Sequence, residues 1–176
     1  SYYGFQEKID SLSLAVTLLG LVVVANLVMS AQVFENLGKY GNGAGLNLEG
    51  FWKHSVGTAF IVRALAGRLK LKTPSAFLAG MLHDLGKVVL DHCFTDYYKP
   101  VIQKVQNGSP TASTEEEILG LSHADVGGQL AMEWRFSDRI TDCILHHHDP
   151  MKACCDPQLA CLVHVADAIC RKLEHE

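Results

Sequence analysis

The sequence lacks the features that are typical of nucleic-acid-binding proteins and of β-sheet proteins. Its 15 lysine and arginine residues are outnumbered by 19 acidic residues, which gives a net charge of −4. Proteins that bind nucleic acid carry a basic face, because positive side chains displace the counterions of the phosphates. No stretch shows the sustained alternation of apolar and polar residues that predicts strands. We therefore expect neither a nucleic-acid partner nor a sheet.

Paired cysteines and a secretory signal are also missing. The 6 cysteines are irregularly spaced and include no C-x-x-C pair, so neither a disulfide framework nor a zinc ribbon is indicated. A soft metal site built from Cys143, Cys154 and Cys155 is a weaker interpretation than buried or incidental thiols. The chain opens SYYGF, without a basic segment. The sequence favours a cytoplasmic location and reads like the middle of a longer protein.

The longest uncharged run, residues 11–34, has the length of a membrane-spanning helix. At a rise of about 1.5 Å per residue, it is long enough to cross a bilayer. However, polar residues such as Asn26 and Gln32 interrupt it, and its flanks carry neither a basic cluster nor an aromatic belt. We expect no membrane span, but two core helices over residues 12–34 that meet near Gly20.

Helical signals carry the rest of the chain, and the predicted fold is all-α. Asn47 can cap a helix that runs to about Lys70, and Thr73-Pro74 can start one that carries residues 76–85. The acidic residues that follow Ser113 fit the first turn of a helix, where the helix dipole favours negative charge. Further helices are expected over residues 91–106, 137–147 and 157–173.

Histidines and aspartates recur in apolar helical segments. The pair His83-Asp84 is flanked by AGML and LG, so we expect it in the interior, where an unpaired charge is costly. Any single histidine is more simply a core or surface residue. The ordered set, however, predicts that side chains from several helices converge on one or two divalent ions. Its members are His54, His83, Asp84, His123, residues 146–148 and Asp167.

Such a site has a definite chemistry. Mixed nitrogen and oxygen ligation suits Fe, Mn, Mg or Zn. Two ions roughly 3.5–4 Å apart can hold a bridging hydroxide and a phosphoryl oxygen together. Lys87 lies one turn after Asp84 and can steady a phosphate there. We therefore predict Asp84 and Lys87 as the catalytic residues of any hydrolysis at this site.

The order of these residues resembles the ligand set of the HD superfamily of metal-dependent phosphohydrolases, which consists of a His, a His-Asp doublet and a distant Asp. Longer segments are similar to the HDOD domain, the HD-related output domain of bacterial signalling proteins. They are SYYG at residues 1–4, AVTLLG at 15–20, FWKHS at 51–55, AFLAGMLHDLGK at 76–87, EILGLSHADVG at 117–127 and HHDP at 147–150. The resemblance extends over essentially the whole chain.

The HDOD resemblance implies an all-α fold of two helical parts. Residues 1–46 would be the end of the first part with connecting core helices, and residues 47–176 would be the HD-like bundle with the metal site. The resemblance also implies a role in signal transduction, with signalling proteins or attached sensory and output modules as partners. A nucleotide is a further candidate ligand, and no membrane is expected as a partner.

The related HD-GYP cyclic-dinucleotide phosphodiesterases provide a stricter comparison. Matching positions are occupied by His54, His83, Asp84, Lys87, His123, His147, His148 and Asp167. Two departures count against that activity. Residues 149–156 read DPMKACCD where the D-x-G-Y-P signature is expected, and Gly50 stands where members with three metals carry an acid. The sequence favours a regulatory module that retains a divalent-metal site, and the alternative is a metal-dependent phosphohydrolase acting on nucleotides or other phosphoesters. A structural relic without metal is the third interpretation.

The histidines do not all receive the same role. Helical spacing places His147 on the apolar stripe of its helix, so it is the predicted ligand of the run, and the resemblance adds His148. His146 is expected only to cap the helix C-terminus. We expect His164 to be a packed core imidazole or to orient a neighbouring carboxylate, and His92 to lie on the surface.

Overall fold

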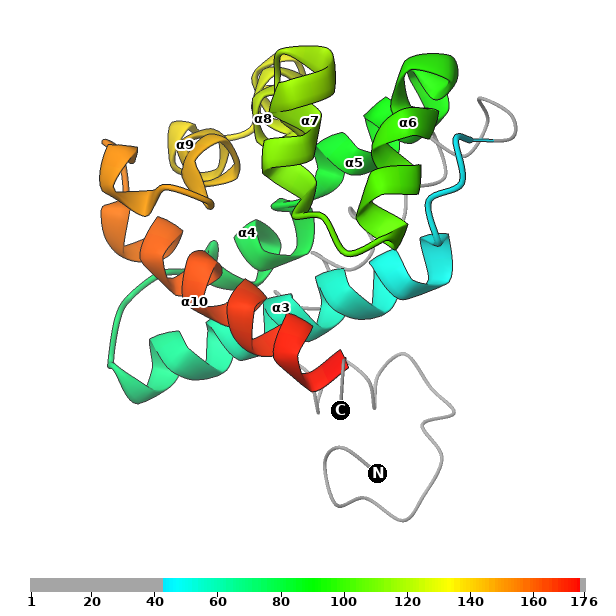
Figure 1. Cartoon of the computed structure of the whole chain (residues 1–176). Helices are drawn as coiled ribbons and strands as arrows, with labels where there is room; N and C mark the ends of the chain where they lie inside the picture. The colour runs from blue at the N-terminus through cyan, green and yellow to red at the C-terminus, as the bar shows by residue number, and fades with distance from the viewer. Residues whose placement is uncertain (1–42, 175–176) are drawn as a thin grey trace, which may run out of the picture.

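The structure, a computed structural model, describes residues 43–174 (Figure 1). In chain order its elements are α3 (Leu48–Arg68), α4 (Ala76–Leu82), α5 (Leu85–Cys93), α6 (Thr95–Gln106), α7 (Thr111–Leu119), α8 (His123–Glu133), α9 (Asp138–His146), a short 3-10 helix (Pro150–Lys152) and α10 (Pro157–Glu174). No strand occurs within this range. The all-α prediction is confirmed, whereas the two helices expected over residues 12–34 lie outside the described residues, as does nearly all of the predicted first part, residues 1–46.

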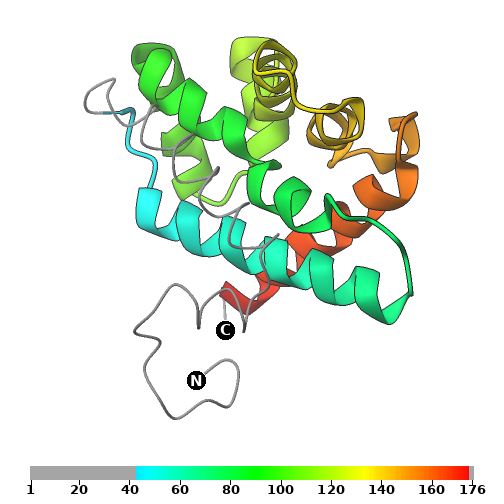
Figure 2. The same cartoon turned by 180° about the vertical axis from the view of Figure 1, so that it is seen from behind.

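The helices form two groups that meet at the centre of the molecule. Helix α10 crosses α3, and α4 packs against both of them, while α5 and α8 lie side by side (Figures 1 and 2). The largest hydrophobic core joins α3, α4, α9 and α10 through buried residues that include Val62, Met81, Ile144 and Val163. A smaller core holds α5 to the start of α3 through Phe51, Leu85 and Val88. No helix in residues 43–174 is both long and apolar enough to cross a bilayer.

Several helix ends follow the signals in the sequence. The Asn47 side chain accepts a hydrogen bond of 3.0 Å from the Gly50 backbone and begins α3 as predicted. Gly108 closes the segment after α6 with a positive φ of 94°, which a residue without a Cβ adopts at little cost. Ser122 and Asp125 form a capping box at the start of α8. Local capping chemistry thus defines much of the helical framework.

Three helix boundaries differ from the predicted ones. The helix expected over residues 76–85 ends at Leu82, and a new helix begins at Leu85 after a turn at His83-Asp84. The helix expected over residues 91–106 is divided at Phe94. Helix α7 begins at Thr111 rather than at Ser113. In the first two cases a break lets apolar residues on both sides reach the core, which helical periodicity alone cannot reveal.

The contact between α5 and α8 depends on the absence of a side chain at Gly86. A Cβ placed there would lie 1.9 Å from the His123 carbonyl oxygen and 2.8 Å from the Gly127 backbone nitrogen. Both atoms belong to the backbone, so neither can rotate away. The approach brings the start of α8 beside the end of the His83-Asp84 turn.

Substituting Gly86→Ala should destabilise the fold by about 1–3 kcal/mol, because the new methyl group overpacks a backbone contact. Gly67→Ala is the matched control, since a Cβ at Gly67 meets nothing within 4 Å and alanine favours a helix by up to about 1 kcal/mol. Urea unfolding of both variants measures the difference. Equal stabilities for the two variants would contradict the close packing of α5 on α8.

Candidate metal centre

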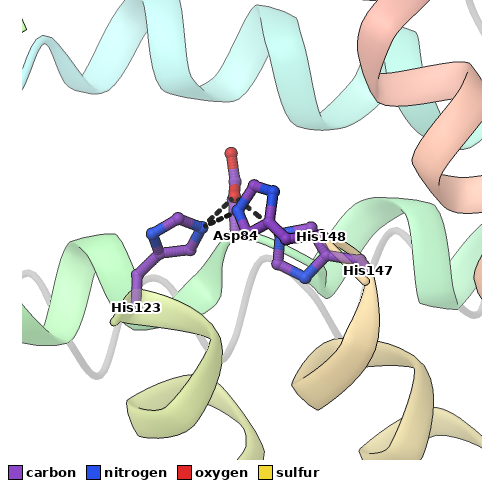
Figure 3. Close-up of side chains that lie close together, drawn as sticks. All are labelled: Asp84, His123, His147 and His148. Carbon is purple, nitrogen blue, oxygen red and sulfur yellow. Dashed lines mark hydrogen bonds and ion pairs between the residues drawn. The ribbon is translucent and has the colours of Figure 1, made fainter. Parts of the chain in front are cut away.

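The predicted ligand residues meet in the interior as two overlapping groups. His54, His83 and Asp84 form one group, and Asp84, His123, His147 and His148 form the other, with the candidate ligand atoms of each group within 4.8 Å of one another. Asp167 adjoins the first group, because its Oδ1 lies 3.1 Å from His54 Nε2. We call the first group with Asp167 cluster A, and the second group cluster B. Figure 3 shows cluster B, with His123 at the start of α8 and with His147 and His148 in the turn that directly follows α9.

Asp84 belongs to both clusters because its two carboxylate oxygens face opposite sides. Its Oδ2 lies 3.4 Å from His83 Nε2 and 3.7 Å from His54 Nε2. Its Oδ1 lies 3.0 Å from His123 Nε2 and 3.5 Å from His147 Nε2. Asp84 would therefore contribute one oxygen to each of the two candidate metal sites.

The turn between α4 and α5 explains how adjacent residues serve one centre. Successive side chains on a regular helix point about 100° apart, since there are about 3.6 residues per turn. Asp84 leaves helical geometry with φ −98° and ψ 9°, and both His83 and Asp84 are almost completely buried. The break that the helical pattern did not predict therefore directs both side chains into the same interior.

Backbone carbonyls orient two of the histidines. His83 Nδ1 donates to the Gly80 carbonyl at 2.8 Å, and His147 Nδ1 donates to the Ile144 carbonyl at 2.8 Å. Because a carbonyl oxygen only accepts, the proton lies on Nδ1 in both rings, and a neutral ring presents a lone pair at Nε2. Both Nε2 atoms face Asp84, as ligands of a shared centre would.

Four buried atoms of the clusters make no hydrogen bond to any described residue. They are His83 Nε2, Asp84 Oδ1, His147 Nε2 and Asp167 Oδ1. Leaving such an atom unsatisfied costs about 1–3 kcal/mol, and more for a charged group. A divalent cation in cluster A would satisfy His83 Nε2 and Asp167 Oδ1, and one in cluster B would satisfy Asp84 Oδ1 and His147 Nε2, so the residues present fit metal ions.

Two cations on the rim of the clusters hold the aspartates. Lys87 Nζ lies 2.5 Å from Asp84 Oδ2, and the Arg171 guanidinium pairs with Asp167 Oδ2. Lys87 was predicted, but Arg171 was not. The signal for Arg171 was its position four residues after Asp167, which places both side chains on one face of α10.

The electrostatics of cluster A keep its carboxylates ionised. Burial alone would raise the pKa of Asp84, but the nearby His83 and Lys87 charges hold that pKa well below its ordinary value. The pKa of Asp167 is likewise lowered against burial, by the His54 and His83 imidazoles that face it. Burial works against a charged His83, yet Asp84 and Asp167 raise its pKa to about 9. His83 must therefore release a proton before its Nε2 can bind a metal.

In cluster B, the His147 and His148 imidazoles are neutral instead. Burial lowers the pKa of His147 to about 4, against the opposing effect of Asp84. Burial, followed by the neighbouring His147 and His123, lowers the pKa of His148 to about 2. His148 Nε2 lies only 2.9 Å from His123 Nε2 (Figure 3). Neutral rings with converging nitrogens are in the protonation state that metal binding requires.

A pocket of about 280 Å³ opens onto one side of this centre. Its lining includes His54 and Asp84 together with the side chains of Lys87 and Arg171. The backbone of the loop before α3 forms part of its wall at Leu46, where Asp91 Oδ1 accepts a 2.8 Å hydrogen bond. The pocket thus gives an anionic ligand access to cluster A beside two cationic side chains.

Three other histidines of the described residues, His92, His146 and His164, lie outside both clusters. His146 turns away, with its Nε2 3.6 Å from Asp142 Oδ1. The expectation that His164 is a packed core imidazole is wrong, because the residue is exposed. Its Nδ1 donates to the His147 carbonyl at 2.7 Å rather than to a neighbouring carboxylate. The expectation that His92 lies on the surface is wrong, because it is 9% exposed and contacts the Val88 carbonyl.

Two buried residues beside the clusters were not predicted. Glu115 was assigned only to the first turn of a helix, but it is fully buried and contacts His123. Tyr98 is 1% exposed and donates to Glu115 at 2.7 Å. The cysteines play no part in either cluster: Cys143 is buried in the core, while Cys154 and Cys155 are exposed.

Known proteins are similar to this chain in sequence and in fold. The sequence profile of the HDOD domain matches residues 1–150. Ribonuclease Y of Geobacter metallireducens is 33% identical over 118 residues, which cover 67% of this chain but only 17% of that protein. A Ribonuclease Y of Thermus thermophilus is 32% identical over 117 residues, which cover 66% of this chain and 16% of that protein. The chain therefore corresponds to a small part of these relatives.

Solved structures agree with the profile. The crystal structure of an HDOD domain protein with unknown function from Geobacter sulfurreducens superposes with a TM-score of 0.80 at 32% identity, covering 96% of this chain and 57% of that one. A "Putative phosphohydrolase" from Shewanella amazonensis superposes with a TM-score of 0.77 at 26% identity, covering 96% of this chain and 62% of that one. Since the profile covers most of the sequence and the fold agrees, the chain belongs to the HDOD domain family.

Proposed function

We propose that the chain is a regulatory signal-transduction module of the HDOD family whose clusters A and B hold divalent metal ions. The observation that carries the proposal is the convergence of four buried ligand atoms that lack hydrogen bonds. His54, His83, Asp84 and Asp167 would hold one ion, and Asp84, His123, His147 and His148 would hold the other. The mixed nitrogen and oxygen ligands suit Fe, Mn, Mg or Zn.

A regulatory role is supported by family membership and by the segment that follows the paired histidines. Pro150–Lys152 form a 3-10 helix in place of the expected D-x-G-Y-P signature, and Met151 is 86% exposed. The segment thus offers no substrate-positioning loop of the HD-GYP kind. The proposed partners are signalling proteins or attached sensory and output modules, and a nucleotide is a candidate ligand for the pocket beside cluster A.

The second candidate function is metal-dependent phosphohydrolysis, and the pocket beside cluster A favours it. When bound, a pair of divalent ions supplies an activated water and stabilises charge on a phosphoryl group. The Lys87 side chain is 14% exposed and the Arg171 side chain 44% exposed. Both can bind phosphate oxygens at the pocket mouth and orient a phosphoester over Asp84.

RNA is not proposed as a ligand, although relatives of this chain are named Ribonuclease Y. The matched region is only 17% of the Geobacter metallireducens protein and 16% of the Thermus thermophilus one. The net charge of −4 provides no general attraction for phosphates. RNA is therefore included in the assay below as a test of the predicted absence of a nucleic-acid partner.

His147→Ala should weaken metal binding in cluster B by more than about 100-fold, because loss of a direct ligand exceeds the 10–100-fold effect of outer partners. His146→Ala is the matched control, since this adjacent ring faces Asp142. Elemental analysis of protein purified without a chelating column, followed by metal titration, measures both. The proposal fails if the wild-type protein binds no divalent metal, or if the two variants lose it equally.

The purified protein should show at most slow, metal-dependent cleavage of a bis-aryl phosphate with Mn²⁺ or Fe²⁺, and little or none of a cyclic dinucleotide. Positioning groups account for roughly 7 kcal/mol or more of a barrier, and the family loop that would position a dinucleotide is absent. Asp84→Ala should abolish any activity. Rapid cleavage of a cyclic dinucleotide that is lost in Asp84→Ala would show that the protein is an enzyme and would contradict a purely regulatory role. Equally rapid cleavage of RNA would contradict the prediction that the protein has no nucleic-acid substrate.

Lys87→Ala should lower any bis-aryl phosphate activity, because the pocket loses a phosphate-binding cation. Lys99→Ala is the control, since Lys99 forms an ion pair of the same spacing with Asp96 on the surface, at 2.9 Å. Initial rates at saturating metal measure the effect. Equal rates for the two variants would show that Lys87 has no role in binding or cleaving the phosphoester.

A further inference from the structure

Glu115 is a buried carboxylate that belongs to neither cluster. It lies on α7 with no exposed surface. Its Oε2 accepts hydrogen bonds from the His123 backbone nitrogen at 2.7 Å and from His123 Nδ1 at 2.5 Å. Its Oε1 accepts a 2.7 Å hydrogen bond from the Tyr98 hydroxyl. The carboxylate is thus satisfied on both oxygens, and two of its three donors belong to one residue.

The position of Glu115 is not explained by helix formation. An acidic residue near the start of α7 gains its dipole energy equally well on the surface, where the neighbouring Glu116 and Glu117 lie. Burying a carboxylate is costly unless it is well hydrogen-bonded. Within residues 43–174, its ion-pair partner is His123 rather than a lysine or an arginine. The buried charge is therefore directed onto one candidate metal ligand.

His123 differs in this respect from the other fully buried histidines. His83 and His147 donate from Nδ1 to backbone carbonyls, whereas His123 donates to a carboxylate. A carboxylate partner fixes the proton on Nδ1, leaves the lone pair on Nε2, and makes the ring a stronger donor to a metal. The His123 Nε2 so defined lies 3.0 Å from Asp84 Oδ1 and 2.9 Å from His148 Nε2, as the dashed lines in Figure 3 show.

Tyr98 completes the arrangement from α6. Its ring packs in a small core with Leu90 and Val101, so the direction of its hydroxyl is fixed. Burial, reinforced by Glu115, raises the pKa of Tyr98 above its ordinary value. The hydroxyl therefore stays protonated and donates a hydrogen bond to Glu115 Oε1. Oε2 then accepts the hydrogen bonds from His123.

We propose that Glu115, itself oriented by Tyr98, is a positioning residue that fixes the His123 ring for metal binding in cluster B. The proposal rests on the metal centre proposed above. It states that Glu115 affects the affinity for the ion in cluster B only. Cluster A contains neither His123 nor any described contact with Glu115, so its affinity is expected to be independent of this residue.

The first test compares metal binding by Glu115→Gln and Glu116→Gln. Both changes replace a carboxylate with an amide of the same shape on the same helix, but only Glu115 is buried. Each metal-free protein is titrated with metal, and its thermal midpoint is recorded. In Glu115→Gln, the dissociation constant of one ion, assigned to cluster B, should rise by about 10–100-fold. The other ion should bind as in wild type. Tyr98→Phe should shift the same ion by a smaller factor, and Tyr97→Phe should shift neither ion, because Tyr97 is 72% exposed.

The second test needs no metal. Nitrogen-15 NMR of the His123 ring in the metal-free protein should show the Nδ1-protonated tautomer in wild type and in Glu116→Gln. Glu115→Gln should increase the Nε2-protonated form, because a neutral amide oxygen is a weaker acceptor for the Nδ1 hydrogen than the carboxylate is. A protein that is merely destabilised would keep the wild-type tautomer in its folded fraction.

The outcomes separate the two proposals. If wild type binds no metal, the proposed metal centre is wrong, and the tautomer measurement alone decides whether Glu115 positions His123. An unchanged tautomer in Glu115→Gln overturns the positioning role. Unchanged affinity for both ions, or an equal loss of both, overturns its assignment to cluster B.

Discussion

The arrangement of the helices around the centre depends on the burial of Asp84. This carboxylate is 2% exposed and lies among four imidazole rings, where an uncompensated charge would be prohibitively costly. The α4–α5 break directs it inward, and the contact at Gly86 brings α8 close enough for His123 to reach its Oδ1. Lys87 then meets Oδ2 from the following turn. Helix boundaries, interhelical spacing and charge placement are thus linked to one side chain.

The two aspartates are compensated in the same way. Asp84 pairs with Lys87 and Asp167 pairs with Arg171, in each case through Oδ2 and a cation three or four residues later on the chain. The Oδ1 atoms of both aspartates remain without hydrogen bonds in the described part of the chain. Side-chain cations can therefore support the charges of the metal-free fold while the inward oxygens stay available. A metal ion bound there would add to the stability of an interior whose carboxylates are already ionised.

The sequence was informative where a feature depends on neighbouring residues, as helix capping does. It was also informative where histidines and aspartates follow one another in a characteristic order along the chain. Asn47 predicted the start of α3 from its capping chemistry, and His83-Asp84 was predicted to be buried from its apolar flanks. The break at that pair was missed, because apolar residues on both sides continue a helical pattern. Glu115 was missed for a different reason: an acid near a helix start has a sufficient local explanation, and only tertiary packing reveals its contact with His123. His92 was predicted to lie on the surface for a similar reason, because its neighbours in sequence give no sign of the tertiary packing that buries it.

Clusters A and B share Asp84 but face different surroundings, which bears on how the site can be used. The pocket beside the centre is lined by His54, Asp84, Lys87 and Arg171, but by none of the histidines of cluster B. A ligand in this pocket meets two cations and cluster A directly, and it reaches cluster B only through the Asp84 carboxylate. Glu115 supports cluster B from the opposite side, beyond His123. A ligand in this pocket would therefore contact cluster A directly, whereas cluster B would act on it only through the carboxylate that both clusters share.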